Sequence, residues 1–119
     1  MNEQKLFNKA YAGLAKQGFQ RSSNPGNGCL YRGPNGFKCA IGHAIPDSKY
    51  KKSMDSQSLG SEPRLRRVLR AIGYRGDFYL ADELQGVHDF GSEPAIMQKN
   101  MRAFAKRHGL RVPQLESES

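Results

Sequence analysis

The sequence predicts an α+β fold: a mostly helical single domain with about four helices around a small antiparallel β-hairpin or three-stranded sheet. In four segments, apolar residues recur at helical spacing. Between the first two segments, a Pro-Asn-Gly turn at residues 34–36 is typical of a hairpin. The 119 residues are enough for one core but not for two ordinary domains. We therefore expect one globular domain over residues 1–111, followed by a frayed polar tail over residues 112–119.

The first helix is expected over residues 2–17, with lysines largely outside its apolar stripe. That stripe consists of Phe7, Ala10, Tyr11 and Leu14. Gly18 then supplies a C-terminal stop. Residues 19–22 are expected to form a short strand beside the hairpin, and residues 23–28 are rich in turn formers and predict a loop.

The hairpin is predicted with a three-residue loop and a glycine bulge, because Gly36 accepts the left-handed conformation that follows Pro34 and Asn35. In this register Cys29 lies opposite Ile41. One face is apolar (Cys29, Tyr31, Phe37, Cys39 and Ile41) and the other is basic (Arg32 and Lys38). The two cysteines become diagonal neighbours about 7 Å apart, near the outer limit for a disulfide.

Three further helices are expected after a helical turn at residues 46–48 and a loop that extends to residue 61. One begins at residues 61–63, ends at Gly73, and has Leu65, Val68, Leu69 and Ile72 on its apolar face. The next is capped by Asp77 and points Leu80, Leu84 and Val87 inward. The last begins at residues 92–94, buries Met97, Met101 and Phe104, and ends at Gly109 with Leu110 packed back as in a Schellman cap.

The net charge of +8 is unevenly distributed along the chain. Residues 1–75 carry 14 basic and 4 acidic side chains, whereas residues 76–93 carry 5 acidic side chains and no basic ones. A basic body of this kind favours an anionic partner, either nucleic acid or an acidic protein surface. The strongest basic patch lies on the helix over residues 61–72, and we predict its arginines as partner-binding residues: Arg64, Arg66, Arg67 and Arg70. No apolar run approaches the length of a membrane span, so no membrane partner is expected.

Both cysteines lie within residues 29–47, together with His43. The absence of a signal peptide and the low cysteine content predict reduced thiols in a cytoplasmic protein. The simplest interpretation of Cys29 and Cys39 is two small buried apolar side chains. A zinc site formed by Cys29, Cys39 and His43 is one alternative, although its C-x9-C-x3-H spacing lacks a fourth ligand. The other is a catalytic Cys39 with His43 or His88 as base. No other cofactor is expected.

Two segments carry a family resemblance. The first is Cys39-Ala-Ile-Gly-His-Ala-Ile-Pro-Asp47, and the second contains Leu84-Gln85 followed by His88-Asp89. With these segments the chain resembles a family of small uncharacterised bacteriophage and prophage proteins, in which C-A-I-G-H-L-I-P-D precedes L-Q-x-x-H-D. Ala44 stands where that family more often has leucine. The resemblance implies a phage or prophage origin and action in a bacterial cytoplasm, and it carries no activity with it.

The leading hypothesis for function is an accessory phage protein that binds a host macromolecule, as an inhibitor or modulator of a host polymerase, nuclease or immune complex. The partner would be a host protein or a protein–nucleic-acid complex. A second hypothesis is a cysteine-dependent hydrolase or transferase, with Cys39 as nucleophile, His43 or His88 as base, and Asp89 or Gln85 as orienting group. A third is a zinc-stabilised nucleic-acid-binding module in which the arginines contact phosphates. The sequence does not indicate an oligomeric state.

Overall fold

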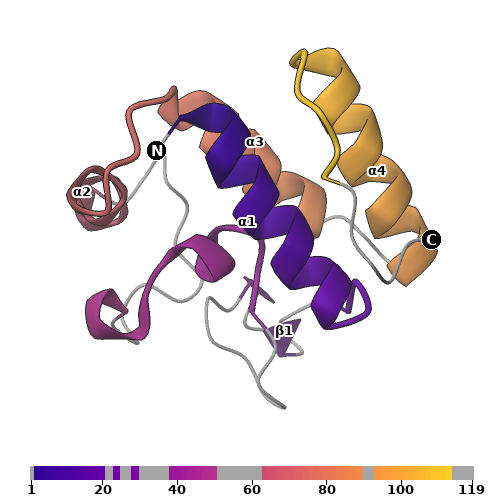
Figure 1. Ribbon diagram of the computed structural model, residues 1–119. Helices are drawn as coiled ribbons and strands as arrows, with labels where there is room; N and C mark the ends of the chain where they lie inside the picture. Colours follow the sequence, from indigo (N-terminus) through magenta and orange to yellow (C-terminus); the bar gives the residue numbers. More distant parts are fainter. Residues whose placement is uncertain are drawn as a thin grey trace.

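The computed structural model describes residues 2–20, 23–24, 28–29, 38–50, 63–89 and 93–113. Within these ranges the chain forms four α-helices: α1 (Glu3–Lys16), α2 (Pro63–Ala71), α3 (Phe78–Asp89) and α4 (Pro94–Arg107). Two short 3-10 helices, η2 (Ile41–Ala44) and η3 (Asp47–Lys49), precede α2. The strands β1 (Ser23–Asn24) and β2 (Gly28–Cys29) have two residues each. In Figure 1, α1 and α3 lie in the middle of the molecule, with α4 on one side and α2 on the other.

The fold class predicted from the sequence is wrong, because the described residues form a helical domain rather than an α+β one. Only a two-residue antiparallel ladder is present in these ranges, and it pairs Ser23 with Cys29 and Asn24 with Gly28. So short a ladder cannot provide a layer against which helices pack. Cys29 pairs with Ser23, whereas the predicted hairpin required it to pair with Ile41. The turn of that hairpin, at residues 34–36, lies outside the described residues.

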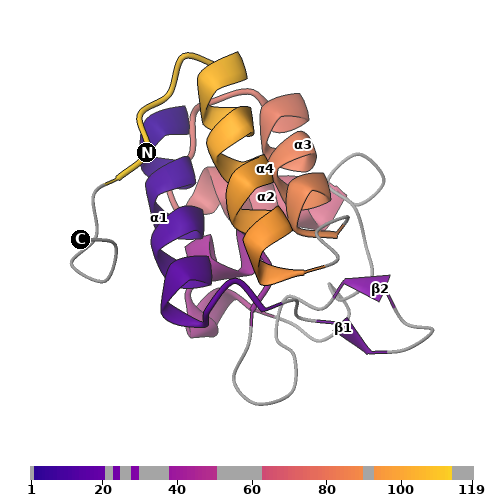
Figure 2. The same ribbon diagram turned by 90° about the vertical axis from the view of Figure 1, so that its right-hand side faces the viewer.

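The core lies between α1, α3 and α4, which run side by side in Figure 2. All four residues of the predicted α1 stripe are completely buried, as are Leu84, Met97, Met101 and Phe104, so the inward faces of these helices are confirmed. Aromatic rings link the elements: the Phe7 and Phe104 rings stack at 5.9 Å, and the Tyr11 and Phe19 rings meet edge to face at 5.4 Å. η2 packs against both α1 and α3. No helix among the described residues is long and apolar enough to span a bilayer.

Three of the helices end in the same motif, in which a left-handed glycine is followed by an apolar residue. The pairs are Gly18-Phe19, Gly73-Tyr74 and Gly109-Leu110, with glycine φ values of 68°, 96° and 66°. In each, the N–H of the apolar residue donates to the carbonyl five residues earlier, at 2.7, 2.9 and 2.8 Å respectively. These are Schellman caps, and they confirm the predicted stops of α1, α2 and α4. Because the first cap holds Phe19 at a φ of 56°, a strand cannot begin at that residue, as the sequence had suggested.

Candidate functional site

The segment that begins at Cys39 and the part of α3 around Gln85 meet at η2. The side chain of Gln85, from α3, is 97% buried, and its Oε1 accepts a hydrogen bond of 3.0 Å from the backbone N–H of Ile41. Ile41 is the first residue of η2, where an N–H has no partner inside the helix. Gln85 therefore caps η2 from across the core. This contact is also the physical reason why residues 40–41 turn into a helix instead of extending into the predicted strand.

A second glutamine fixes the other side of η2. The Nε2 of Gln17 donates to the carbonyls of Gln20 and Lys38, both at 2.8 Å. Its Oε1 accepts from the Lys38 N–H at 3.0 Å and lies 2.9 Å from Nε2 of His43. Because this oxygen can only accept, His43 carries a proton on Nε2. All four hydrogen-bonding positions of the Gln17 amide are thus filled.

Gly13 of α1 provides the space that His43 occupies. A Cβ added at Gly13 would overlap the imidazole ring, so no larger residue fits there without movement of His43 or of the helix. A glycine in the middle of an amphipathic helix costs about 1 kcal/mol relative to alanine, and such a residue is a sign of close approach. We call the contacts of η2 with Gly13, Gln17 and Gln85 the η2 junction. In the sequence, the mid-helix glycine was the one available signal of this junction.

The other cysteine and histidine candidates are positioned as follows. Cys39 is a free thiol with no exposed surface, and it precedes η2 in the core. A reactive cysteine needs at least partial exposure, and Cys39 has none. Among the described residues, no three histidine, cysteine or acidic side chains are close enough to hold a metal ion. The side chains of Cys29, His88 and Asp89 lie outside the described part of the structure.

The predicted arginine patch lies on α2, at the opposite end of the molecule from α4. Arg67 and Arg70 are exposed and Arg66 is half-buried, whereas the Arg64 side chain is not among those described. Arg70 donates to the carbonyl of Tyr74 at 3.0 Å, and its guanidinium carbon lies 4.5 Å from the centre of the Phe78 ring. Arg66 and Arg67 make no ion pair in the described ranges, and the buried Nε of Arg66 has no hydrogen-bond partner. The structure therefore leaves two guanidinium groups for an external acceptor.

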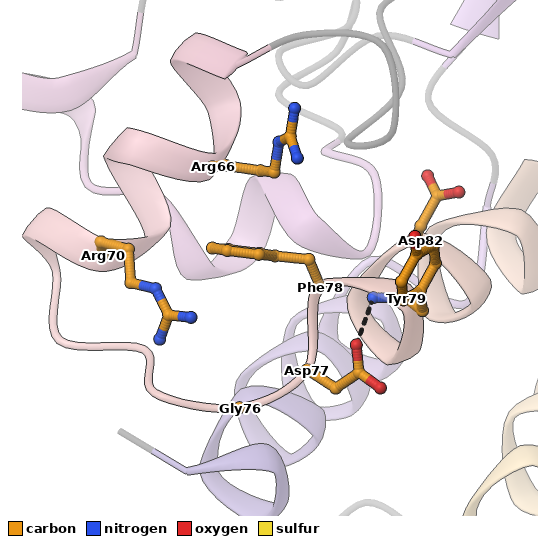
Figure 3. A pocket seen from close by; sticks show the side chains of 7 residues that line it. All are labelled: Arg66, Arg70, Gly76, Asp77, Phe78, Tyr79 and Asp82. Carbon is orange, nitrogen blue, oxygen red and sulfur yellow. Dashed lines mark hydrogen bonds between the residues drawn. The ribbon is translucent and has the colours of Figure 1, made fainter.

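A pocket of about 280 Å³ lies between α2 and the start of α3. It is lined by Arg66, Arg70, Gly76, Asp77, Phe78, Tyr79 and Asp82. Figure 3 shows the Phe78 ring extended from α3 toward α2, between the two arginines. Tyr79 is 84% exposed, the highest exposure of the large hydrophobic side chains described. We call this site the arginine–tyrosine pocket. It combines cations, aromatic rings and carboxylates in a small concave surface, and no pattern in the sequence indicates that α2 and α3 form it.

Hydrogen bonds fix the backbone at the rim of this pocket. Asp77 caps α3 as predicted, because its Oδ1 accepts from the Tyr79 N–H at 2.8 Å. The buried hydroxyl of Tyr74 donates to the Asp77 carbonyl at 2.7 Å. Burial, followed by the charges of Glu3 and Asp77, raises the pKa of Tyr74 well above its usual value, so this hydroxyl remains a donor. The backbone that presents Phe78 and Tyr79 is therefore held from both sides.

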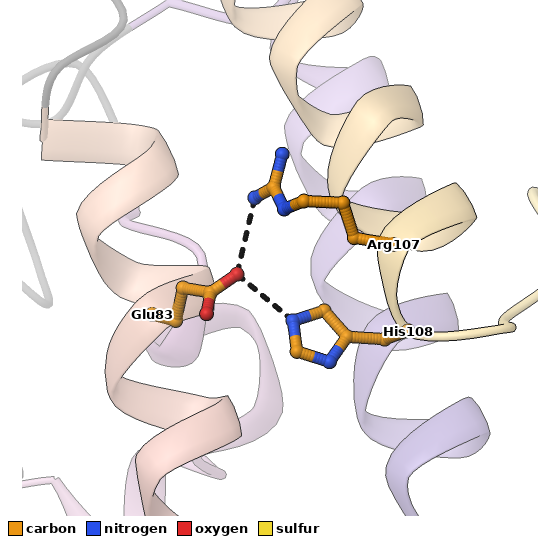
Figure 4. A network of polar contacts seen from close by, with 3 residues as sticks. All are labelled: Glu83, Arg107 and His108. Atoms are coloured by element: carbon orange, nitrogen blue, oxygen red, sulfur yellow. Dashed lines mark hydrogen bonds and ion pairs between the residues drawn. The ribbon is translucent and has the colours of Figure 1, made fainter.

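A polar network joins α3 to the end of α4 on the surface (Figure 4). Oε2 of Glu83 accepts from Arg107 at 3.0 Å and lies 2.8 Å from Nε2 of His108. The hydrogen bond from His108, and then that from Arg107, lowers the pKa of Glu83. The His108 ring also packs 4.5 Å from that of Phe104. All three side chains are partly exposed, so this network links two helices without contributing a buried charge.

Comparisons with models of protein families, with curated proteins and with solved structures find no match to this chain.

Proposed function

We propose that this chain is a phage- or prophage-encoded accessory protein that acts in the bacterial cytoplasm by binding a host protein through the arginine–tyrosine pocket. The origin is supported by the resemblance of the segments around Cys39 and Gln85 to the phage family. The mode of action is supported by the composition of the pocket. Arginine and tyrosine are enriched among the residues that contribute most to protein–protein binding energy.

The observation that carries the proposal is that the side chains of Arg66 and Tyr79 have no hydrogen bond or ion pair among the described residues. Within the described residues, no acidic side chain pairs with Arg66 or Arg67. The side chain of Tyr79 is 84% exposed, although its backbone N–H is fixed by the Asp77 cap. A partner would supply carboxylates to the guanidinium groups and apolar surface to Tyr79. Because the pocket is pre-formed, little entropy is lost in ordering it on binding.

A protein fits this site better than nucleic acid, because Asp77 and Asp82 line the same pocket as the arginines. Two carboxylates would repel a phosphate backbone, whereas they can pair with basic residues that lie beside acidic ones on a protein surface. The hypothesis of a cysteine-dependent enzyme is not taken further, because the thiol of Cys39 has no exposed surface.

The test is affinity capture from nuclease-treated bacterial lysate, followed by calorimetry with the purified partner. The variant is Arg66→Gln/Arg67→Gln/Tyr79→Ala. Its matched control is Lys5→Gln/Lys9→Gln/Ala95→Ser, which changes the same net charge on the outer faces of α1 and α4. Removal of one interface anchor typically costs about 2 kcal/mol or more, so the pocket variant should bind at least about 30-fold more weakly. The control should bind as the unmodified protein does.

Two results would contradict the proposal: capture of no stoichiometric protein by the unmodified chain, or equal affinity of the pocket variant and the control. Protection from hydrogen exchange on partner binding should centre on residues 66–82. Since the pocket side chains are exposed or half-buried, with few internal contacts, the variant's free energy of unfolding should stay within about 0.5 kcal/mol of the unmodified value. A loss of binding can then be assigned to the interface.

A further inference from the structure

A second basic surface lies on the other side of the molecule, on the outer faces of α1 and α4. It consists of six exposed residues: Lys5, Lys9 and Lys16 of α1, and Lys99, Arg102 and Lys106 of α4. We call this surface the basic face. On each helix these residues lie opposite the buried stripe, so they all point away from the core. The basic face is separate from the arginine–tyrosine pocket, and the inference from it does not depend on the function proposed above.

The two rows of the basic face are held next to each other by direct contacts between α1 and α4. The Phe7 and Phe104 rings stack beneath them, and the Arg102 guanidinium lies 5.9 Å from the centre of the Tyr11 ring. The side chain of Gln4 also binds both the N–H and the carbonyl of Arg111, at 2.8 Å each. Figure 2 shows α1 and α4 side by side. The cations therefore form two neighbouring rows on a rigid support.

The charge of this face is of one sign. α4 contains four basic residues and no acidic one, and Glu3 is the only acidic residue in α1. Glu3 faces the segment before α3, because a Cβ added at Gly76 would overlap its side chain. None of the five lysines makes an ion pair in the described ranges of the chain. Unlike the arginine–tyrosine pocket, this surface contains no carboxylate that would repel an anion.

We propose that the basic face binds the sugar-phosphate backbone of double-stranded DNA. Lys5 and Lys9 are one turn apart, or about 6 Å along the helix axis, and packed helix axes are about 8–10 Å apart. Two such rows present positive charge to both strands of a duplex, which carries one negative charge per about 1.7 Å. Single-stranded nucleic acid fits less well, because the basic face includes no exposed aromatic side chain on which unpaired bases would stack.

The test is fluorescence anisotropy with a labelled 20-base-pair DNA duplex, titrated with the full chain over a series of salt concentrations. The variant is Lys9→Gln/Lys106→Gln, and the matched control is Arg66→Gln/Arg67→Gln, which removes the same charge from α2, where Arg66 lines the arginine–tyrosine pocket. Each lost phosphate contact lowers the slope of log K against log salt by about 0.9, so the variant should lose about 1.8 from its slope. Its affinity at 0.1 M salt should fall at least about tenfold. The control should match the unmodified chain.

Equal losses in the variant and the control would overturn the inference, since binding would then follow net charge and not position. Affinity that does not depend on salt would also overturn it, as would tighter binding of a single strand of the same sequence than of the duplex. Failure here leaves protein binding by the pocket untouched, because arginines of α2 are replaced in the control of this experiment and in the variant of the other. Circular dichroism melting curves of all variants should coincide, because the replaced side chains lie on the surface.

Discussion

The η2 junction and the arginine–tyrosine pocket both bring together residues from distant parts of the chain, but they differ in how far their polar groups are satisfied. In the junction, the Gln17 amide uses all its hydrogen-bonding positions and Gln85 meets a backbone N–H that has no partner within η2. At the pocket, Arg66 has no acidic partner among the described residues, and neither does its neighbour Arg67. The residues with the most chemical character in the sequence lie in or beside the junction: His43 is part of η2 and Cys39 precedes it. The comparison shows that reactive residue types can serve packing, and that polar side chains without an internal partner lie elsewhere in the described structure.

The largest effect is expected from Gly13→Ala, which places a methyl group where the His43 imidazole lies. The cost should be about 3 kcal/mol, at the upper end of the range for overpacking, because the ring is also tied to Gln17 and has little freedom to move. Urea unfolding followed by circular dichroism measures it.

Gly86→Ala is the matched control for Gly13→Ala. It also replaces a helical glycine by alanine, but nothing lies within 4 Å of the added Cβ. This variant should gain up to about 1 kcal/mol from the higher helix propensity of alanine. If both variants were stabilised to the same extent, the η2 junction would not be closely packed. The contrast between a fully packed junction and an open arginine–tyrosine pocket would then disappear.

A smaller loss is expected from Gln85→Met, which keeps the volume of the side chain but removes the acceptor of the Ile41 N–H. A buried donor without a partner costs about 1–3 kcal/mol, and we expect about 2 kcal/mol. The amide proton of Ile41 should also exchange faster with solvent, which NMR can follow. The control is Gln4→Met, since Gln4 binds Arg111 on the surface, where water replaces the lost hydrogen bonds. Equal losses in the two variants would contradict the role assigned to Gln85.

The smallest effect on stability is expected at Glu83. Its partners Arg107 and His108 are partly exposed, as the arginines beside the pocket are. Because its folded pKa is lowered, the stability that it contributes is complete above the pKa of the unfolded carboxyl and is lost as the pH falls through the folded pKa. His108→Ala removes the largest cause, so the pKa of Glu83 should rise toward its ordinary value in an NMR titration. Arg107→Ala should raise this pKa less. A larger rise in the second variant than in the first would reverse the order of causes.

The helices could be predicted from the sequence because their signals are local. The apolar stripe of α1, the Asp77 cap and the left-handed glycines each depend on residues within one or two turns. The segment before Ile41 could not be predicted in this way. Its apolar residues fit a strand by pattern, but its backbone follows hydrogen bonds from Gln17 and Gln85, which lie 21 and 44 residues away in the chain. The arginines of α2 were expected at the surface, whereas their approach to Phe78 and Tyr79 depends on how α2 and α3 pack.

The contact of Gln4 with Arg111 has a consequence for the connectivity of the chain. One side chain bridges the first turn of α1 and the segment after α4, so positions that are 107 residues apart in the sequence are neighbours in space. A short peptide linker spans such a gap without strain. A circular permutant that joins these two segments and is reopened between other elements would therefore keep every helix in its present place. In this molecule the position of α1 is set by what it packs against, and not by its being the first helix of the chain.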